Sequence, residues 1–407
     1  MATIAEVAFP PSGTTPPSIL DPYRQDMQAI GLNKKASALY VTFTPYHVFL
    51  ATLLAGGRPR QLRQDLIVVA DFTDAQFLIK ALRTWDENSF TDIRLLPGAY
   101  GLRRKGMRQL AYAANIPRIR RSVSKLVVDE IYVFNDARPE AQAALHYGRT
   151  KNPNVIVTFV EDGLTAYGSH GRAPGSVFAR LGAMALFGRF WEDVTVLGTS
   201  RWVNSVRATF PSFVRPELKR YPIRPVVDPS GLPGRLAQHV MRCLGATCFR
   251  SEDLGKLEVV VAITQSSVAR AVPDYAQAVT QCISDIADAG LRVAVKYHPR
   301  EPLGDYLNLG QDRRIMQLPK MLPIELIYAL AGERLRVVIG DLSNALLTAR
   351  WLCPRASVLT LAQAFGYVDP PLMETFSKLG IRCLGEAKDL QEAVRREVPS
   401  HAWGPQK

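Results

Sequence analysis

The sequence predicts two α/β domains, each built on a parallel sheet with helices on both faces, that face one another across a cleft. The chain has 407 residues, which favours two domains over a single core. Apolar runs alternate with amphipathic stretches through both halves, a pattern typical of parallel sheets buried on both faces. A segment rich in Pro and Gly, centred on the letters DPSGLPG, separates the halves and is expected to link them.

The N-terminal half alternates strands and helices from residue 38 onward. Apolar runs predict strands at 38–42, 65–70, 93–96, 130–134 and 155–160. Amphipathic stretches predict helices at 46–54, 75–85, 104–127 and 140–147. Pro117 is expected to interrupt the third of these helices, because proline removes a backbone donor.

The C-terminal half repeats the alternation. It predicts strands at 257–264, 293–296, 336–340 and 356–361, and helices at 275–289, 324–331, 344–352 and 386–396. The chain therefore divides into a flexible leader (1–35), a first Rossmann-like domain (36–225), a linker (226–245) and a second Rossmann-like domain (246–400). The leader is rich in Pro, Ser and Thr and lacks the basic and apolar regions of a signal peptide.

Composition describes a globular protein and argues against several classes. Hydrophobic residues make up 47% of the chain and charged residues 21%, and no run approaches the ~20 apolar residues of a membrane span. The five cysteines are scattered and never form a C-x-x-C pattern. This predicts reduced thiols and a cytoplasmic location, without a disulfide framework or a zinc site.

The net charge of +13 predicts an anionic partner, with a solvated basic face as the alternative. Much of the excess lies in the first half, at Arg58, Arg60, Arg63, Arg103, Arg104, Lys105, Arg108, Arg118, Arg120, Arg121 and Lys125. Because no nucleic-acid-binding motif accompanies the charge, an acidic glycan or an anionic lipid surface fits better than nucleic acid. The apolar stretch 177–191 has two interpretations: a buried helix, which we favour, or a peripheral contact with an anionic membrane.

One candidate catalytic motif follows the predicted strand 155–160. In open parallel sheets, ligands bind beyond the carboxyl ends of the strands. Glu161 and Asp162 lie at such an end, where a carboxylate can take a proton from an attacking hydroxyl. Gly163 would let the chain turn sharply beside them, and an ordinary polar turn is the alternative.

The second domain has two such strand ends. His298 and Pro299 follow the strand that ends at Lys296, and the imidazole there can bind a leaving phosphate and donate a proton to it. Ser343 and Asn344 follow strand 336–340 and open a helix. There they either cap the helix or help to hold a phosphate.

Two further strand ends carry polar residues. Thr44 and Pro45 follow the first strand of the chain, and Gln265 and Ser266 follow the first strand of the second domain, where they could reach a nucleotide. Ordinary turn chemistry is the favoured interpretation of both.

Together these motifs resemble, in order and spacing, the bacterial sialyltransferases and polysialyltransferases. That family has an acid–acid–Gly motif, a His-Pro motif and a Ser-rich motif, matched here by Glu161-Asp162-Gly163, Lys296-x-His298-Pro299 and Ser343-Asn344, with Glu325 on a predicted helix between the last two. The resemblance implies the two-domain glycosyltransferase fold called GT-B, and inverting transfer of sialic acid from CMP-sialic acid. The implied acceptor is a lipooligosaccharide, a capsule or a growing polysialic acid chain.

The resemblance also implies roles for residues. Asp162 would be the general base, with Glu161 orienting it or sharing its role, and His298 would be the general acid or electrostatic partner at the departing CMP. Glu325 would hold the cytidine ribose. The other implied contacts to the donor are Lys296, Pro299, Ser343, Asn344, Gln265 and Ser266, and those on the acceptor side are Gly163, Thr44 and Pro45. Many relatives have a second Ser where Asn344 stands, and an amide can also donate a hydrogen bond.

The sequence predicts no metal or cofactor, because it contains no Asp-x-Asp pair of the kind that binds Mg²⁺ or Mn²⁺ in metal-dependent glycosyltransferases. Three alternatives remain. A capsular transferase using CMP-Kdo has similar motifs, and a CDP-glycerol transferase of the teichoic-acid type is more distant. The alternative from another class is a non-catalytic protein of the same fold that binds an anionic glycan or lipid.

Overall fold

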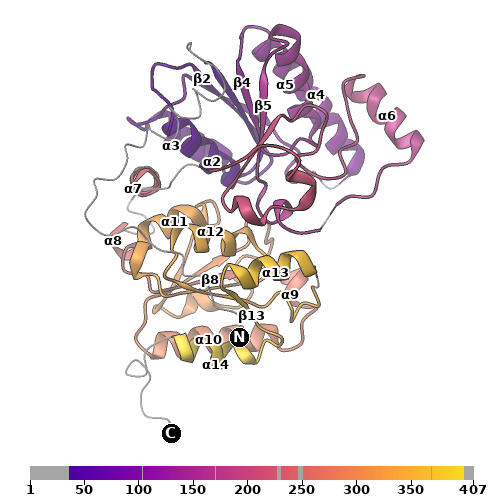
Figure 1. Cartoon of the computed structure of the whole chain (residues 1–407). Helices are drawn as coiled ribbons and strands as arrows, with labels where there is room; N and C mark the ends of the chain where they lie inside the picture. The colour runs from indigo at the N-terminus through magenta and orange to yellow at the C-terminus, as the bar shows by residue number, and fades with distance from the viewer. Residues whose placement is uncertain are drawn as a thin grey trace, which may run out of the picture.

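A computed structural model describes residues 36–102, 104–169, 171–226, 231–245, 251–367 and 369–397. The expected leader, 1–35, lies outside the described residues. Figure 1 shows two α/β domains, one above the other, and each is built around a parallel sheet. The predicted fold class is confirmed.

The N-terminal domain contains a seven-stranded sheet in the order β3-β2-β1-β4-β5-β6-β7, and all its neighbours pair in parallel. Its strands are β1 (Ala38–Thr42), β2 (Gln64–Ala70), β3 (Asp92–Pro97), β4 (Glu130–Val133), β5 (Ile156–Val160), β6 (Ser205–Ala208) and β7 (Ile223–Pro225). The five predicted strands are present. The short strands β6 and β7, at one edge of the sheet, were not predicted.

The C-terminal domain contains a six-stranded parallel sheet in the order β10-β9-β8-β11-β12-β13. Its strands are β8 (Val259–Ile263), β9 (Val293–Tyr297), β10 (Ile315–Gln317), β11 (Val337–Gly340), β12 (Ser357–Thr360) and β13 (Ile381–Cys383). Here too the predicted strands occupy the middle of the sheet, and the missed ones, β10 and β13, are its edges.

Helices connect the strands in both domains. In the first they are α2 (Pro45–Gly56), α3 (Ala75–Arg83), α4 (Lys105–Val123), α5 (Pro139–Lys151), α6 (Val177–Phe187) and the 3₁₀ turns η1 (Gly163–Ala166), η2 (Pro211–Phe213) and η3 (Pro216–Leu218). Those that follow are α7 (Leu232–Leu244), α8 (Ser251–Leu254), α9 (Ser266–Ala269), α10 (Tyr275–Asp288), α11 (Ile324–Ala331), α12 (Asn344–Leu352), α13 (Pro370–Lys378), α14 (Asp389–Glu397), η4 (Leu309–Gln311) and η5 (Gly332–Arg334).

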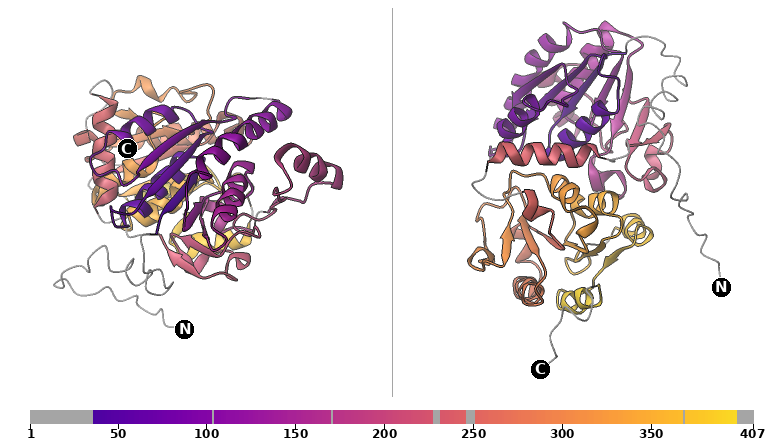
Figure 2. Two further views of the ribbon diagram at one scale, coloured as in Figure 1. Left: turned by 90° about the horizontal axis from the view of Figure 1, so that it is seen from above. Right: turned by 90° about the vertical axis from the view of Figure 1, so that its left-hand side faces the viewer.

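Two of the helices expected from the sequence differ from the structure, and α7, α8, α9 and α13 were not predicted. α4 continues through Pro117 without interruption. The stretch 177–191 does not form a buried helix: most of α6 is exposed, and Figures 1 and 2 show it standing away from the body of the first domain. The expected linker region contains α7, which lies between the domains and contacts α2, α3 and α11 (Figure 2, right).

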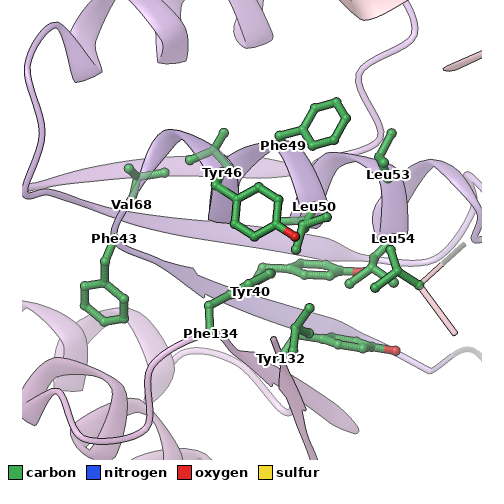
Figure 3. Packing of buried hydrophobic residues seen from close by; sticks show 14 of the residues in the cluster. Tyr40, Phe43, Tyr46, Phe49, Leu50, Leu53, Leu54, Val68, Tyr132 and Phe134 are labelled. Carbon is green, nitrogen blue, oxygen red and sulfur yellow. The ribbon is translucent and has the colours of Figure 1, made fainter. Parts of the chain in front are cut away.

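The core of the first domain is built on β1, β2 and β4, which are buried on both faces. Helix α2 packs on one apolar face of this sheet. Figure 3 shows Leu50 and Leu54 of α2 beside Tyr40 and Tyr132 of the sheet. The rings of Tyr40 and Tyr132 stack with centroids 4.8 Å apart. In the first turn of α2, the His47 ring stacks on Phe134, the residue after β4, so this turn lies at the carboxyl ends of β1 and β4.

Both sheets reverse their strand order at a central pair, β1 and β4 in one domain and β8 and β11 in the other. Loops that leave such a pair in opposite directions open a crevice at the carboxyl ends of the strands. The fold therefore has one ligand-binding edge in each domain.

Candidate active site

The two binding edges meet in one pocket of about 400 Å³ between the domains. Asp162 lines it from the first domain, and His298 lines it from the second. Of the other residues singled out from the sequence, the pocket is lined by Thr44, Pro45, Lys296, Pro299, Glu325, Ser343 and Asn344. Strand ends far apart in the sequence thus form a single site.

Asp162 follows β5 and is held by two donors. His47 Nε2 lies 2.7 Å from its Oδ1, and Asn135 Nδ2 donates to its Oδ2 over 3.1 Å. The side chain remains 20% exposed, on the pocket side. A carboxylate in this position accepts hydrogen bonds from the protein behind it and faces a ligand in front.

Glu161, its neighbour, is buried away from the pocket lining. It accepts hydrogen bonds from the hydroxyls of Tyr46 and Tyr167 and from Thr209, whose backbone N–H and hydroxyl lie 2.9 and 2.8 Å away. Burial raises the pKa of Glu161, against these hydrogen bonds, which lower it. This position corrects the expectation that Glu161 shares the catalytic role, because its oxygens are occupied in holding the turn after β5.

His298 follows β9, and its hydrogen bonding fixes the tautomer of the ring. The Arg300 backbone N–H donates to its Nδ1 over 3.1 Å, so in the neutral ring Nε2 carries the proton. Burial, reinforced by the charges of Arg300 and Lys296, lowers the pKa of His298 to about 4. The unliganded site therefore presents a neutral imidazole donor.

Two buried side chains of opposite charge, Lys296 and Glu325, line the same pocket as His298. Burial lowers the pKa of Lys296 to about 8, although the charge of Glu325 opposes the shift. Burial raises the pKa of Glu325 to about 7, and Lys296 opposes that shift. Lys296 Nζ also donates to the Lys320 carbonyl over 3.1 Å. This wall of the pocket can therefore offer both a cation to a phosphate and a carboxylate to hydroxyls.

Ser343 and Asn344 open α12, as the sequence predicts, but Asn344 also makes a contact between the domains. Ser343 caps the helix by accepting from the Ala345 backbone N–H over 3.2 Å. The Asn344 Oδ1 accepts from the Leu164 backbone N–H of the other domain over 2.9 Å. Gly163 does not line the pocket: it has a φ of 59°, and a Cβ there would lie 2.1 Å from the Asn344 side chain. A glycine is needed here because a larger residue would clash with Asn344 of the other domain.

The two further strand ends behave differently from each other. Thr44 caps α2 by accepting from the His47 backbone N–H, and Pro45 occupies the first turn, as ordinary helix-start chemistry requires. Gln265 and Ser266 lie outside the pocket lining. Ser266 is buried, and both its backbone N–H and its hydroxyl donate to Glu301. The expected contact of this pair with the nucleotide does not fit these positions.

Sequence reasoning missed His47 and Asn135, the two partners of Asp162. Both lie at carboxyl ends of strands in the same sheet, His47 in the first turn after β1 and Asn135 just after β4. The rule that selected Thr44 and Asp162 would have selected them too. Among the described residues, no group of three or more His, Cys, Asp or Glu side chains is arranged to hold a metal ion.

Two parallel-sheet domains that enclose a pocket between the carboxyl ends of their strands form the GT-B fold, which glycosyltransferases and some epimerases share. Comparison with family models gives a match to the alpha-2,8-polysialyltransferase family over residues 102–362, more than half of the chain. The chain belongs to this family, as the resemblance of its motifs implies. Comparison with curated protein sequences found no match.

Solved structures of similar fold share little sequence with this chain. S. aureus MnaA in complex with UDP is 13% identical, with a TM-score of 0.52, over 89% of this chain and 87% of that one. A putative UDP-N-acetylglucosamine 2-epimerase from Listeria monocytogenes is 11% identical, with a TM-score of 0.51, over 90% of each chain. A Photobacterium 2,6-sialyltransferase with CMP and lactose is 12% identical, with a TM-score of 0.48, over 86% of this chain and 78% of that one. The first two comparisons show that this chain shares its fold with those two proteins.

Proposed function

We propose that the enzyme transfers sialic acid from CMP-sialic acid to a hydroxyl of a glycan, with inversion at the anomeric carbon. The observation that carries this proposal is that Asp162 and His298 line one pocket from opposite domains. The acceptor oxygen forms a bond to the anomeric carbon and gives its proton to Asp162. The bond from that carbon to the phosphate oxygen breaks, and CMP leaves with the electron pair.

His298 acts on the leaving phosphate. A neutral ring with its proton on Nε2 can donate a hydrogen bond to the oxygen on which negative charge develops. The phosphate charge would raise the pKa of His298 from its low value in the unliganded site. The ring can then either stabilise the departing oxygen or protonate it, as a general acid does.

The remaining donor contacts follow from charge. Lys296 and Ser343 lie on the same wall as His298 and suit the phosphate, while Glu325 suits the ribose hydroxyls. CMP leaves with a single phosphate, so these groups and the start of α12 supply the positive potential that a metal supplies in other glycosyltransferases. We therefore expect full activity in the presence of EDTA.

The acceptor fits the charge of the protein. A lipooligosaccharide, a capsule or a polysialic acid chain carries negative charge, and the basic residues of the first domain would attract it. A capsular transferase that uses CMP-Kdo would share this site chemistry, so the donor sugar has to be identified by experiment.

The test is product analysis with CMP-sialic acid and CMP-Kdo, using wild type, Asp162→Asn and His298→Ala. We expect a sialylated product from the wild type and losses of at least ~100-fold in kcat for each variant, the scale of general acid–base catalysis. Asp86→Asn, an exposed change outside the pocket, is the matched control. Transfer from CMP-Kdo alone would contradict the donor assignment, and undiminished turnover in both site variants would contradict the mechanism.

We also propose a peripheral contact with an anionic membrane through α6. Val177, Phe178 and Leu181 form an apolar face that points to solvent, and Phe178 is 87% exposed. Residues 173–191 contain no acidic residue. The neighbouring helix α4 contacts α6 and carries exposed basic side chains, among them Arg108 and Arg121. Apolar side chains flanked by cations are the features with which an interfacial helix binds anionic lipid.

No helix among the described residues is long and apolar enough to cross a membrane. A helix lying in the interface needs neither property.

A further inference from the structure

We propose that His47 is a positioning residue for the transfer reaction: its Nε2–H group holds the Asp162 carboxylate toward the acceptor hydroxyl. This inference rests on the proposed function, in which Asp162 is the base. It concerns a residue that does not line the pocket and that neither the motifs nor the family match single out.

The surroundings of His47 fix its ring. The side chain is 1% exposed. The ring stacks on Phe134 with centroids 5.1 Å apart, and its backbone N–H donates to the Thr44 hydroxyl at the start of α2. A ring held by stacking and by a helix cap has little freedom to rotate, so its hydrogen bond to Asp162 has a fixed direction.

The hydrogen bonds of the ring determine its tautomer. The Phe43 backbone N–H donates to Nδ1 over 3.3 Å, so Nδ1 carries no proton. The ring proton is therefore on Nε2, which lies 2.7 Å from Asp162 Oδ1. The bond is therefore an N–H donor to a carboxylate oxygen, and it leaves the other lone pairs of the carboxylate free to accept a proton.

A second donor completes the arrangement. Asn135 Nδ2 donates to the other oxygen, Oδ2, of Asp162, so the two oxygens are held from two different strand ends, β1 and β4. The plane of the carboxylate is thereby set by the sheet rather than by its own loop. The position of the catalytic base strongly affects the reaction rate, because a displacement of about one ångström can lower the rate about 100-fold.

The test uses three variants of the whole enzyme. In His47→Gln the side-chain amide can place an N–H where Nε2 stood, whereas in His47→Asn it is too short, and His47→Ala has no donor. We expect kcat to fall by about 10- to 100-fold in His47→Ala and His47→Asn, with a clear recovery in His47→Gln. CMP affinity, measured by calorimetry, should stay the same in all three, because the ring lies behind the acceptor side.

The pH–rate profile separates positioning from a merely structural role. Loss of the Nε2–H donor removes a group that favours the charged carboxylate, so the acid limb of the profile should move to higher pH in His47→Ala and return in His47→Gln. The variants leave unchanged the other titratable or charged groups that line this pocket, which are Tyr46, Asp71, Tyr100, Lys296, His298, Arg300, Lys320 and Glu325.

The outcomes are distinct. Variants that melt like wild type and keep its kcat and its acid limb would overturn the role of His47. A His47→Gln enzyme that is folded but as slow as His47→Ala would overturn it as well. Activity retained in Asp162→Asn would instead overturn the proposed function, whatever the His47 variants do.

Discussion

Asp162 and Glu161 are adjacent in the chain, yet their carboxylates have opposite environments. Successive side chains at the end of a strand point in opposite directions. Glu161 therefore enters the protein, where it meets Tyr46, Tyr167 and Thr209, and Asp162 faces the pocket. The acid–acid–Gly motif thus combines a carboxylate that holds the turn, one that can react, and a glycine at the contact between the domains.

Lys296 gives a prediction about pH at the level of a single residue. Because its pKa is lowered to about 8, the side chain is charged below that pH and loses its charge as the pH rises through it. If it binds the donor phosphate, CMP affinity should fall by about tenfold between pH 7.5 and 9.5, the scale of one hydrogen bond from a charged group. Calorimetric titration with CMP at several pH values measures this.

Lys296→Met is the control for that experiment, since it keeps much of the length of the side chain without the charge. Its affinity should be lower at pH 7.5 and constant up to pH 9.5. The pKa values of His298 and Glu325, about 4 and about 7, lie below this window. A slope of equal size in wild type and variant would assign the pH dependence to another group.

At the level of elements, the sequence predicts the central strands and their polar ends well. An apolar run marks each strand, and a polar residue directly after the run marks its carboxyl end. β1, β5, β9 and β11 are apolar and β-branched, and each is followed by a polar residue that lines the pocket. The missed strands are β7, β10 and β13 at the edges of the sheets and β6 beside β7. They are short and partly exposed, so they lack the continuous apolar run that marks the central strands.

Contacts between elements could not be predicted in this way. His47 and Asn135 precede Asp162 by 115 and 27 residues, and only the strand order brings them to it. The double role of Asn344 depends on how two domains meet, which no local pattern encodes. α6 was misjudged for a related reason: apolar composition predicts burial, but none of the described elements covers its outer face.

That exposed face of α6 gives a prediction for liposome flotation. Phe178→Ser combined with Leu181→Ser should reduce binding to vesicles that contain phosphatidylglycerol, because each substitution removes apolar area from the interface. Transfer to a soluble acceptor should be unchanged, since neither residue lines the pocket. Leu303→Ser, at an exposed leucine of the other domain, is the matched control. Equal flotation of all three proteins, or none by wild type, would contradict the membrane contact.

At the level of the whole molecule, the two halves of the site are joined by hydrogen bonds between the domains. The Leu164 backbone N–H, two residues from Asp162, donates to Asn344 Oδ1, and the Ser169 N–H donates to Asp369 over 2.8 Å. Domains of this kind open and close around ligands by hinge motion. Because the first of these bonds joins the loop of Asp162 to the helix that Ser343 caps, we expect a closing movement to bring the two walls of the pocket together.

This link predicts different effects for two substitutions at one position. Asn344→Ala removes the acceptor for the Leu164 N–H, so the open form should be more populated and kcat/KM should fall by about 2- to 10-fold, the worth of one hydrogen bond. Asn344→Asp keeps an acceptor oxygen and should stay closed, but its added charge would face the proposed phosphate site and should raise the KM for CMP-sialic acid. Small-angle X-ray scattering would report a larger radius of gyration for the first variant alone. If neither its scattering nor its kcat/KM differs from wild type, this bond does not govern closure.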